Sequence, residues 1–415
     1  MKLSDLRTPA LVLDRARLER NVAAMSERMK GLGVELRPHL KTAKSLEVAK
    51  LATAGHSGGV TVSTLDEAAY FARGGFRDIT YAVGIVPSKL AEVAALARDG
   101  ARIAVITDSV EVARAIAREA EALDADFRVL IEIDSGSHRA GVDPQDPALV
   151  EIARALDGAA GVELRGVLTH AGHSYACRSA AEIEAVAEDE RLAVVSAAER
   201  LCAAGFAAPV VSVGSTPTAL FARDLSGVTE ARPGVYVFHD LYQAGLGCCG
   251  LDDVALTVLA SVIGHRPRHD HLLIDAGALA LSQDRSTTHQ REDMDFGLVC
   301  DPSGARPLAG LRVTRVNQEH GFVEAPGGVV PFAELPIGSR VRVMPNHACA
   351  VIRRLQRSLA VPLQNLLAEM AHPGGHDVVK HVAGEVFLDD FFFAGFSVPG
   401  FIGDLKYAEL PYGEQ

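Results

Sequence analysis

The sequence predicts a TIM-type (β/α)8 barrel followed by a second, all-β domain. Between residue 14 and about residue 240, eight short apolar segments alternate with amphipathic helical segments. After about residue 250 this alternation stops, and β-rich segments are separated by Gly- and Pro-rich turns. Strands that alternate with helices are parallel, and eight of them can close into a barrel. An open doubly wound sheet is the alternative, but no GxGxxG sequence follows the first apolar segment.

The barrel is predicted to begin with a helix at Asp14–Gly31, because Leu18, Val22 and Met25 recur there at helical spacing. Two further helices are predicted at Ala43–Ala54 and at Ala181–Ala204, the longest. The eight strands are predicted at Val34–Pro38, Gly59–Val62, Ile79–Val83, Arg102–Ile106, Arg128–Ile133, Glu163–Leu168, Val210–Val213 and Gly234–Phe238. We therefore assign residues 14–245 to the barrel.

Residues 246–360 are assigned to the all-β domain, and residues 361–415 to an atypical C-terminal tail. In the tail, a helix is predicted near Pro362–Ala371, and an aromatic run follows at Phe391–Phe393. The strands of the all-β domain are predicted at Val254–Ile263, His271–Asp275, Leu311–Val316, Gly321–Val323 and Arg340–Val343.

Composition excludes several classes of function. Lys and Arg number 41 against 53 Asp and Glu, a net charge of −12 that disfavours nucleic-acid binding. The sequence contains no apolar run of 18 residues, so it predicts no membrane-spanning helix. The early acidic residues argue against a signal peptide, and the six cysteines include no CxxC pair. These features predict a cytoplasmic protein with reduced thiols.

Lys41 follows the first predicted strand, where TIM barrels carry their catalytic residues. A lysine in the barrel mouth can form a Schiff base with a carbonyl compound. A solvated lysine at a helix start is the alternative for an isolated residue. Polar residues at the neighbouring strand ends favour the catalytic interpretation.

Arg139 follows the fifth predicted strand, and His173 and Tyr175 follow the sixth. Arg139 can pair with an anionic group of a cofactor or with a surface carboxylate. His173 and Tyr175 can act as acid–base groups or stack on a flat ring, although a locally hydrogen-bonded loop is equally compatible. The residues after these strands are therefore candidates for a site at the barrel mouth.

The seventh strand ends in Gly214, Ser215 and Thr216, small residues that let backbone N–H groups approach an anion. TIM barrels often bind phosphate after strands seven and eight. Tyr236, in the eighth predicted strand, can complete this pocket. The position in the strand count is what makes this short segment a candidate phosphate site.

His347 and Cys349 are separated by one residue in the second domain. If the segment is extended, both side chains point to one face. Imidazole and thiolate together suit zinc. A buried free cysteine beside a structural histidine is the alternative, because two ligands do not complete a metal site.

These positions together resemble the fold-type III pyridoxal-phosphate (PLP) family of alanine racemase-like proteins, and within it the D-threonine aldolase and D-serine dehydratase group. The resemblance runs from about Thr8 to Cys349, most of the chain. The segments that carry it are Thr8–Asp14, Arg37–Thr42, Glu132–Asp134, Arg139–Gly141, Tyr236–Phe238, Asp275–Gly277, Glu319–Gly321 and Pro345–Cys349.

The resemblance implies roles for the candidate residues. Lys41 is expected to hold PLP and take the α-proton of a D-amino acid, with His173 and Tyr175 as further catalytic residues. The implied PLP-binding set is Lys41, Arg139, Tyr175, Gly214, Ser215, Thr216 and Tyr236. His347 and Cys349 are expected to bind a divalent metal, zinc or alternatively manganese, that acts on the substrate β-hydroxyl.

The resemblance also implies that residues 1–13 join the β-domain through a strand at Ala10–Leu13, and that the protein is a homodimer. His-x-Cys resembles the dehydratase branch, which predicts pyruvate and ammonia from D-serine. Aldolase-type cleavage to glycine and an aldehyde is the alternative. An amino-acid racemase or a non-catalytic PLP-binding protein is a further one. The segment from Ala350 to Arg357 departs from the family pattern, and the tail after it has no expected counterpart.

Overall fold

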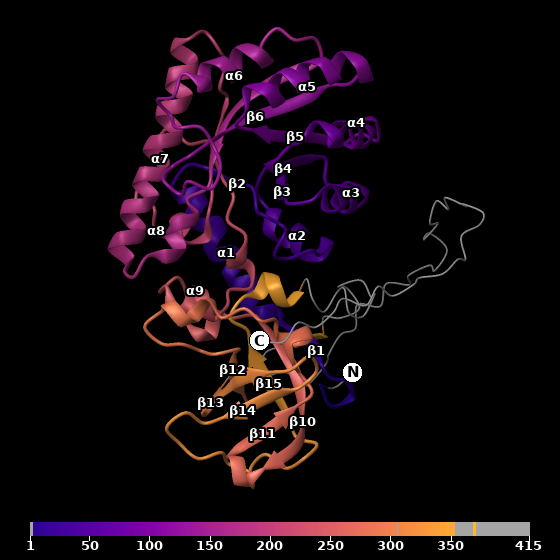
Figure 1. Ribbon diagram of the computed structural model, residues 1–415, viewed down its shortest axis with the longest axis vertical. Coiled ribbons are helices and arrows are strands. Elements are labelled where there is room, and N and C mark those ends of the chain that lie inside the picture. The colour runs from indigo at the N-terminus through magenta and orange to yellow at the C-terminus, as the bar shows by residue number, and fades with distance from the viewer. Residues whose placement is uncertain (1–2, 305, 353–367, 371–415) are drawn as a thin grey trace, which may run out of the picture. The chain divides into compact units, whose positions relative to one another are not determined.

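Two eight-stranded sheets organise the part of the chain that the computed structural model describes, residues 3–304, 306–352 and 368–370 (Figure 1). One sheet is parallel and the other is mostly antiparallel. All of the described residues belong to one compact unit, Met1–His381. The predicted fold class, a TIM-type barrel with a second all-β domain, is confirmed.

The parallel sheet forms the barrel. Its strands are β2 (Glu35–Leu36), β3 (Val60–Val62), β4 (Asp78–Gly84), β5 (Arg102–Thr107), β6 (Phe127–Ile133), β7 (Val162–Thr169), β8 (Val210–Val213) and β9 (Glu230–Ala231). They pair in the order β2-β9-β8-β7-β6-β5-β4-β3. The ends of the sheet meet just beyond β2, where a parallel bridge joins His39 to Thr61. The N–H of Leu40 donates to the Thr61 carbonyl over 2.8 Å, which closes the barrel.

Helices connect the barrel strands and lie outside the sheet (Figure 1). They are α1 (Arg15–Gly31), α2 (Leu46–Thr53), α3 (Leu65–Arg73), α4 (Leu90–Arg98), α5 (Val110–Leu123), α6 (Ala148–Leu156), α7 (Ala180–Ala203) and α8 (Thr216–Phe221). α1 and α7 lie within one residue of their predicted bounds. α2 begins only at Leu46, because the Ser45 hydroxyl caps it by accepting from Val48 N–H. Within the described residues, no helix is both long and apolar enough to cross a bilayer.

Alternate residues of the central strands face two different cores, as the period of two in a strand requires. Ile103 and Val105 of β5 belong to the large apolar cluster that the helices share. Ala104 and Ile106 of the same strand belong to a separate small cluster with Leu130 and Leu168. The second cluster fills only part of the barrel interior.

The rest of the barrel interior includes paired charges. The Arg37 guanidinium donates to Glu230 over 2.7 Å and to Asp78 over 3.2 Å. The other Glu230 oxygen accepts from the Ser212 hydroxyl at 2.7 Å. Burial opposes the charge on Arg37, but these two carboxylates raise the pKa of its guanidinium above the ordinary value. Three barrel strands are thus joined by side chains as well as by backbone.

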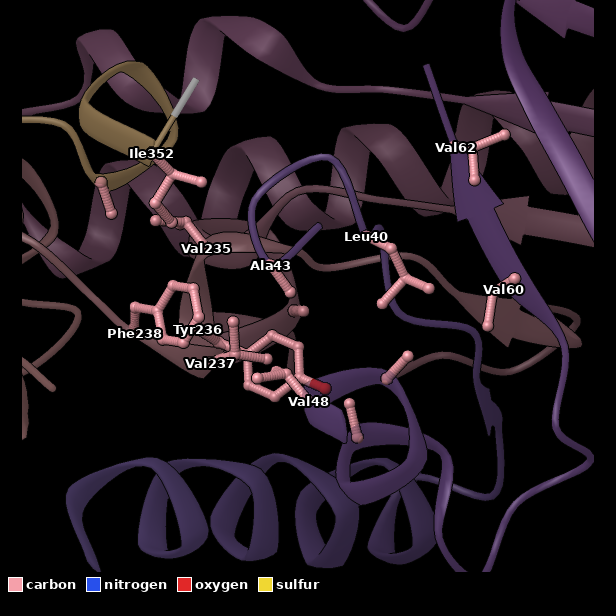
Figure 2. Packing of buried hydrophobic residues seen from close by; sticks show 14 of the residues in the cluster. Leu40, Ala43, Val48, Val60, Val62, Val235, Tyr236, Val237, Phe238 and Ile352 are labelled. Atoms are coloured by element: carbon pink, nitrogen blue, oxygen red, sulfur yellow. The ribbon is translucent and has the colours of Figure 1, made fainter. Parts of the chain in front are cut away.

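The predicted eighth strand at Gly234–Phe238 is wrong. The strand lies earlier, at Glu230–Ala231, and is only two residues long, pairing with β2 and β8. Pro233 has no N–H to continue the ladder, and the chain turns into a 3₁₀ helix at Val235–Val237. The Val-Tyr-Val-Phe run is typical of a strand, yet here it is buried because it packs under the loop after β2 (Figure 2).

The second sheet closes into an antiparallel barrel. Its strands are β10 (Leu256–Arg266), β11 (His271–Ile274), β12 (Leu298–Cys300), β13 (Pro307–Val316), β14 (Gly321–Glu324) and β15 (Arg340–Met344), and β10 pairs with both β15 and β11. β1 (Ala10–Asp14) joins this domain by pairing with β10. β12 has three residues and was not predicted. The domain also contributes two short helices, α9 (Leu241–Gly245) before it and α10 (Ala278–Leu281) within it.

Two predictions at the end of the chain need correction. The His347–Cys349 segment is not extended: β15 ends at Met344, and residues 348–352 are helical. Residues 368–370 form β16 (Ala368–Met370), parallel to β1, so a helix at Pro362–Ala371 is wrong for these three residues. The remainder of that predicted helix and the aromatic run at Phe391–Phe393 lie outside the described residues.

Candidate active site

A cavity of about 690 Å³ lies at the C-terminal ends of the parallel strands and is lined by residues of both domains. Eight of the ten predicted site residues line it: Lys41, Arg139, Tyr175, Gly214, Ser215, Thr216, His347 and Cys349. His173 and Tyr236 do not. This volume lies in the range of small-molecule sites, enough for a cofactor together with an amino acid.

Lys41 lies in the loop between β2 and α2. Backbone hydrogen bonds hold this loop on both sides: His39 N–H donates to the Pro233 carbonyl at 2.9 Å, and Lys44 N–H donates to the Leu40 carbonyl at 2.9 Å. The Lys44 side chain is paired with Glu67. Within the described residues, the Lys41 ammonium has neither an ion pair nor a side-chain hydrogen bond. The loop therefore presents an unengaged amine to the cavity.

Gly214 and Ser215 connect β8 to α8, whose first residue is Thr216. The Ser215 hydroxyl caps α8 by accepting from Thr218 N–H at 3.1 Å. Thr216 Oγ1 accepts from the Gly234 and Tyr236 N–H groups, each at 3.3 Å. These contacts fix the turn at the start of the helix, where backbone N–H groups favour an anion.

Tyr175 lies in the loop after β7. Its hydroxyl hydrogen-bonds to the backbone of Thr216, and burial raises the pKa of its phenol, as do the nearby Cys349 and Asp240. The ring stacks against Tyr242 with centroids 6.0 Å apart, and the Tyr242 hydroxyl donates to the Tyr175 carbonyl. Tyr175 is thus a protonated side chain held beside the Gly214–Thr216 turn.

Glu190, on α7, joins the loops after β7 and β8 from behind. One carboxylate oxygen accepts from Ala171 N–H at 2.9 Å and from Gly214 N–H at 3.1 Å. The side chain is 1% exposed, and burial raises the pKa of the carboxyl. Sequence reasoning missed Glu190 because it lies inside a helix that reads as an ordinary amphipathic segment.

Arg232 is a second residue that the sequence did not single out. Its guanidinium donates to the Thr169 carbonyl at 2.6 Å and to the Ser212 hydroxyl. Burial lowers the pKa of this guanidinium, and Glu230, Glu190 and Glu132 oppose that effect. Arg232 also lines the cavity, so it supplies a buried cation to its floor. Arg232 directly follows β9, whereas the predicted eighth strand lay later, at Gly234–Phe238, and pointed to Tyr236.

Two histidines line the cavity as neutral groups. Burial and the positive charges of Lys41 and Arg232 lower the pKa of His39 well below its usual range. Burial lowers the pKa of His170 to about 3. His170 Nδ1 bonds to the Gly214 carbonyl, which can only accept, so Nδ1 carries the proton. Both rings are neutral at physiological pH.

Arg139 follows β6 on a loop that Asp134 fixes by accepting from Gly136 N–H at 2.9 Å and His138 N–H at 3.1 Å. The guanidinium lies 3.6 Å from Glu132 and its side chain is 60% exposed. Gly141 ends the loop at φ +101°, where a Cβ would stand 2.4 Å from Asp134 N. Only glycine fits there, so the chain can return to β6 and place Arg139 at the cavity.

His173 and Tyr236 are not among the residues that line the cavity. His173 packs beside Gly136: a Cβ added at Gly136 would stand 3.7 Å from the His173 ring. The Tyr236 ring lies among the apolar side chains of Val48, Val235, Val237 and Phe238 (Figure 2). Its hydroxyl is buried with no hydrogen-bond partner in the described part of the chain. Neither residue lines the pocket in the way that the resemblance suggests.

His347 and Cys349 line the opposite wall of the cavity, contributed by the β-domain. His347 Nδ1 lies 3.1 Å from Asp284 Oδ2, and Cys349 Sγ lies 3.0 Å from Thr42 Oγ1. Burial opposes the positive charge on His347, but Asp284 and Cys349 raise the pKa of its imidazole to about 11. Burial would raise the pKa of Cys349, yet His347 and Thr42 lower it overall. Asp284 was not predicted, because it lies 63 residues before its partner.

The donor chemistry of this wall fits a metal. An imidazole whose Nδ1–H is bonded to a carboxylate can exchange its Nε2 proton for a metal, the usual arrangement of histidine ligands. A thiolate is the second donor. Within the described ranges, no three His, Cys, Asp or Glu side chains converge as a complete ligand set. An ion here would complete its coordination with water or substrate, as in catalytic zinc sites.

Comparisons with known proteins agree with this geometry. Residues 13–241 match the family of alanine racemase N-terminal domains, and residues 255–361 match a serine dehydratase domain family. The D-threo-3-hydroxyaspartate dehydratase of Delftia sp. (strain HT23) is 48% identical over 84% of this chain and 92% of its own. The D-serine dehydratase of Dictyostelium discoideum is 32% identical over 90% of this chain and 98% of its own. A D-threonine aldolase from Arthrobacter sp is 30% identical over 83% and 86%.

A solved structure extends the likeness to three dimensions. The metal-free form of a cysteine-to-alanine mutant of D-threo-3-hydroxyaspartate dehydratase has a TM-score of 0.85 and 44% identity. The match covers 92% of this chain and 99% of that one.

Proposed function

Because the chain belongs to the alanine racemase-like family of fold-type III PLP enzymes, we propose that it is a PLP- and metal-dependent dehydratase of D-3-hydroxy amino acids. Its relatives are dehydratases and aldolases, so the chain is a lyase on D-hydroxy amino acids. Dehydration of D-serine would give pyruvate and ammonia. The observation that carries the proposal is one cavity lined by Lys41 from the barrel and by His347 and Cys349 from the β-domain.

The residues of the barrel wall suit PLP. Lys41 offers an unengaged amine, and the turn after β8 offers the Ser215 N–H for a phosphate, since Glu190 already holds the Gly214 N–H. Arg139 faces the same space and can pair with an anionic ring substituent. When bound, PLP supplies an electron sink for the substrate α-carbon.

Each chain group then has a task. Lys41 Nζ would hold the cofactor, and it would take the proton from the α-carbon. Buried Arg232 supplies positive charge to the cavity floor. The neutral His39 and His170 rings leave Lys41, Arg139 and Arg232 as the cations of the barrel wall that line the cavity.

The β-domain wall acts on the other end of the substrate. His347 and Cys349 would hold a divalent metal, zinc or alternatively manganese, which supplies Lewis acidity to a departing hydroxyl. Asp284 orients His347 by accepting a hydrogen bond from its Nδ1–H. The mutant of the dehydratase relative in its metal-free form supports a metal requirement in this family.

Retro-aldol cleavage to glycine and an aldehyde is the second candidate, because D-threonine aldolase of Arthrobacter sp is also a relative. The His-x-Cys pair favours dehydration, since it resembles the dehydratase branch. Incubating the PLP-loaded protein with D-serine and D-threonine, with and without a chelator, separates the two reactions. We expect pyruvate from D-serine that disappears with chelator. Glycine from D-threonine without any pyruvate would instead establish the aldolase.

We further propose a cytoplasmic homodimer that binds small D-amino acids and neither nucleic acid nor membrane. All six cysteines are free thiols, which suits a reducing compartment. Val83 and Val86, near the cavity, are 43% and 46% exposed, which suits cover by a second copy. Light scattering on the purified protein should give twice the 43.9 kDa chain mass.

A further inference from the structure

One hydrogen bond joins the lysine loop of the barrel to the proposed metal segment of the β-domain. Thr42, the residue after Lys41, is 0% exposed, and its Oγ1 lies 3.0 Å from Cys349 Sγ. The two residues are 307 positions apart in the chain. The contact therefore joins the two domains and does not follow from local chain geometry.

The surroundings hold the Thr42 hydroxyl in place. Gly234 packs so closely that a Cβ there would stand 2.8 Å from the His39 carbonyl and 3.3 Å from Thr42 Oγ1. Ala43 and Ile352, next to the two bonded segments, belong to one buried apolar cluster with Val235 (Figure 2). Neither segment can withdraw without opening this cluster.

The metal segment is fixed from the opposite side. Asp240 Oδ2 accepts from Ala348 N–H at 3.0 Å, between the two proposed ligands, while its Oδ1 caps α9 through Gln243 N–H at 2.9 Å. His347 has Asp284 as its outer partner, and Cys349 has Thr42. Each proposed ligand thus has an outer partner that orients it, and of the two outer partners only Thr42 comes from the cofactor loop.

We propose that Thr42 is a positioning residue. Its hydroxyl donates a hydrogen bond to the Cys349 sulfur and thereby sets the metal affinity of the site. A metal-bound thiolate has no proton and can only accept, so the donor must be the hydroxyl. Outer partners of metal ligands typically change metal affinity 10–100-fold when they are removed. The inference rests on the proposed function, because it takes Cys349 as a metal ligand.

The test measures zinc affinity of the PLP-loaded protein by competition with a chromophoric chelator. Thr42→Val keeps the shape of the side chain and removes the donor, whereas Thr42→Ser keeps the donor. Thr53→Val is the matched control, because Thr53 is also buried but donates to the Ala49 carbonyl within α2 at 2.8 Å. We expect Thr42→Val to bind zinc about 10–100-fold more weakly, and Thr42→Ser and Thr53→Val to match wild type within about threefold.

Visible cofactor absorbance and thermal denaturation, recorded on each variant, show whether the fold and the lysine site survive. If Thr42→Val does not fold, the comparison of Thr42→Ala with Thr42→Ser carries the same test. Wild-type zinc affinity in Thr42→Val, while Cys349→Ala loses zinc, would overturn this inference alone. Wild-type zinc affinity in Cys349→Ala would overturn both this inference and the proposed metal site.

Discussion

The barrel and the β-domain supply the two walls of the cavity in different ways. The barrel wall collects residues from the ends of all eight parallel strands, from Lys41 after β2 to Arg232 after β9 in chain order. Backbone ladders fix the spacing of those strand ends. The β-domain wall depends on Asp284 and one short segment, His347–Cys349, held by a few side-chain hydrogen bonds.

This difference predicts which substitutions should weaken cofactor binding and which should weaken metal binding. Changes in the barrel wall should affect the cofactor and the stability of the fold together, because its residues are tied to the strand network. Changes in the β-domain wall should affect metal binding and turnover but should leave cofactor binding and the stability of the fold unchanged. Variants in each wall test that division.

Replacing Lys41 should have the largest effect. Lys41→Ala removes the only group that we assign to both cofactor attachment and proton transfer, so turnover should fall at least about 10³-fold. The visible absorbance of the holoenzyme should disappear as well. Lys50→Ala is the control, because Lys50 lies on α2 and pairs at the surface with Glu47. A yellow, active Lys41→Ala protein would remove the central residue of the account.

Glu190 tests whether the barrel wall couples cofactor binding to stability. Glu190→Ala leaves the Ala171 and Gly214 N–H groups without their acceptor, so the free energy of unfolding should fall by about 2 kcal/mol. PLP affinity should fall with it, because both loops border the phosphate turn. Glu190→Gln keeps a carbonyl acceptor and should stay within about 1 kcal/mol of wild type in urea unfolding. Equal losses in the two variants would show that charge, not hydrogen bonding, matters here.

His239 gives an effect that depends on pH. Burial lowers the pKa of this side chain from 6.5 to about 4, so the folded protein binds fewer protons than the unfolded chain. The free energy of unfolding should therefore be unaffected above pH 6.5 and should fall by about 3 kcal/mol as the pH drops through 4.

His239→Asn removes the titration and tolerates the left-handed backbone at φ +50°. The difference between variant and wild type in urea unfolding should shift with pH in favour of the variant below pH 6.5. A constant difference from pH 8 to pH 4 would exclude His239 as the source.

The sequence predicted those parts of the site in which one chain segment carries its own signal. Lys41 and the Gly214–Thr216 turn follow strands that periodicity places correctly, and His347 and Cys349 are a visible pair. Even there the reason differed for the pair, since the segment is helical after His347 rather than extended.

Residues that act across long separations could not be predicted in this way. Glu190 is one acid among several on a 24-residue helix, and only the fold brings it to Gly214. Asp284 becomes significant only through His347. The run Val235–Phe238 has strand-forming side chains, but Pro233 and the short β9 ended the ladder before it. Pairing and burial, not local preference, decided these positions.

The most direct test of the two-wall account is one variant measured in two ways. In Cys349→Ala, we expect the visible cofactor absorbance and the urea unfolding midpoint of wild type, with pyruvate formation from D-serine lost. Added zinc should restore pyruvate formation to chelator-treated wild type but not to the variant. Wild-type rates of pyruvate formation by Cys349→Ala in the presence of chelator would contradict the assignment of the β-domain wall to metal-dependent dehydration.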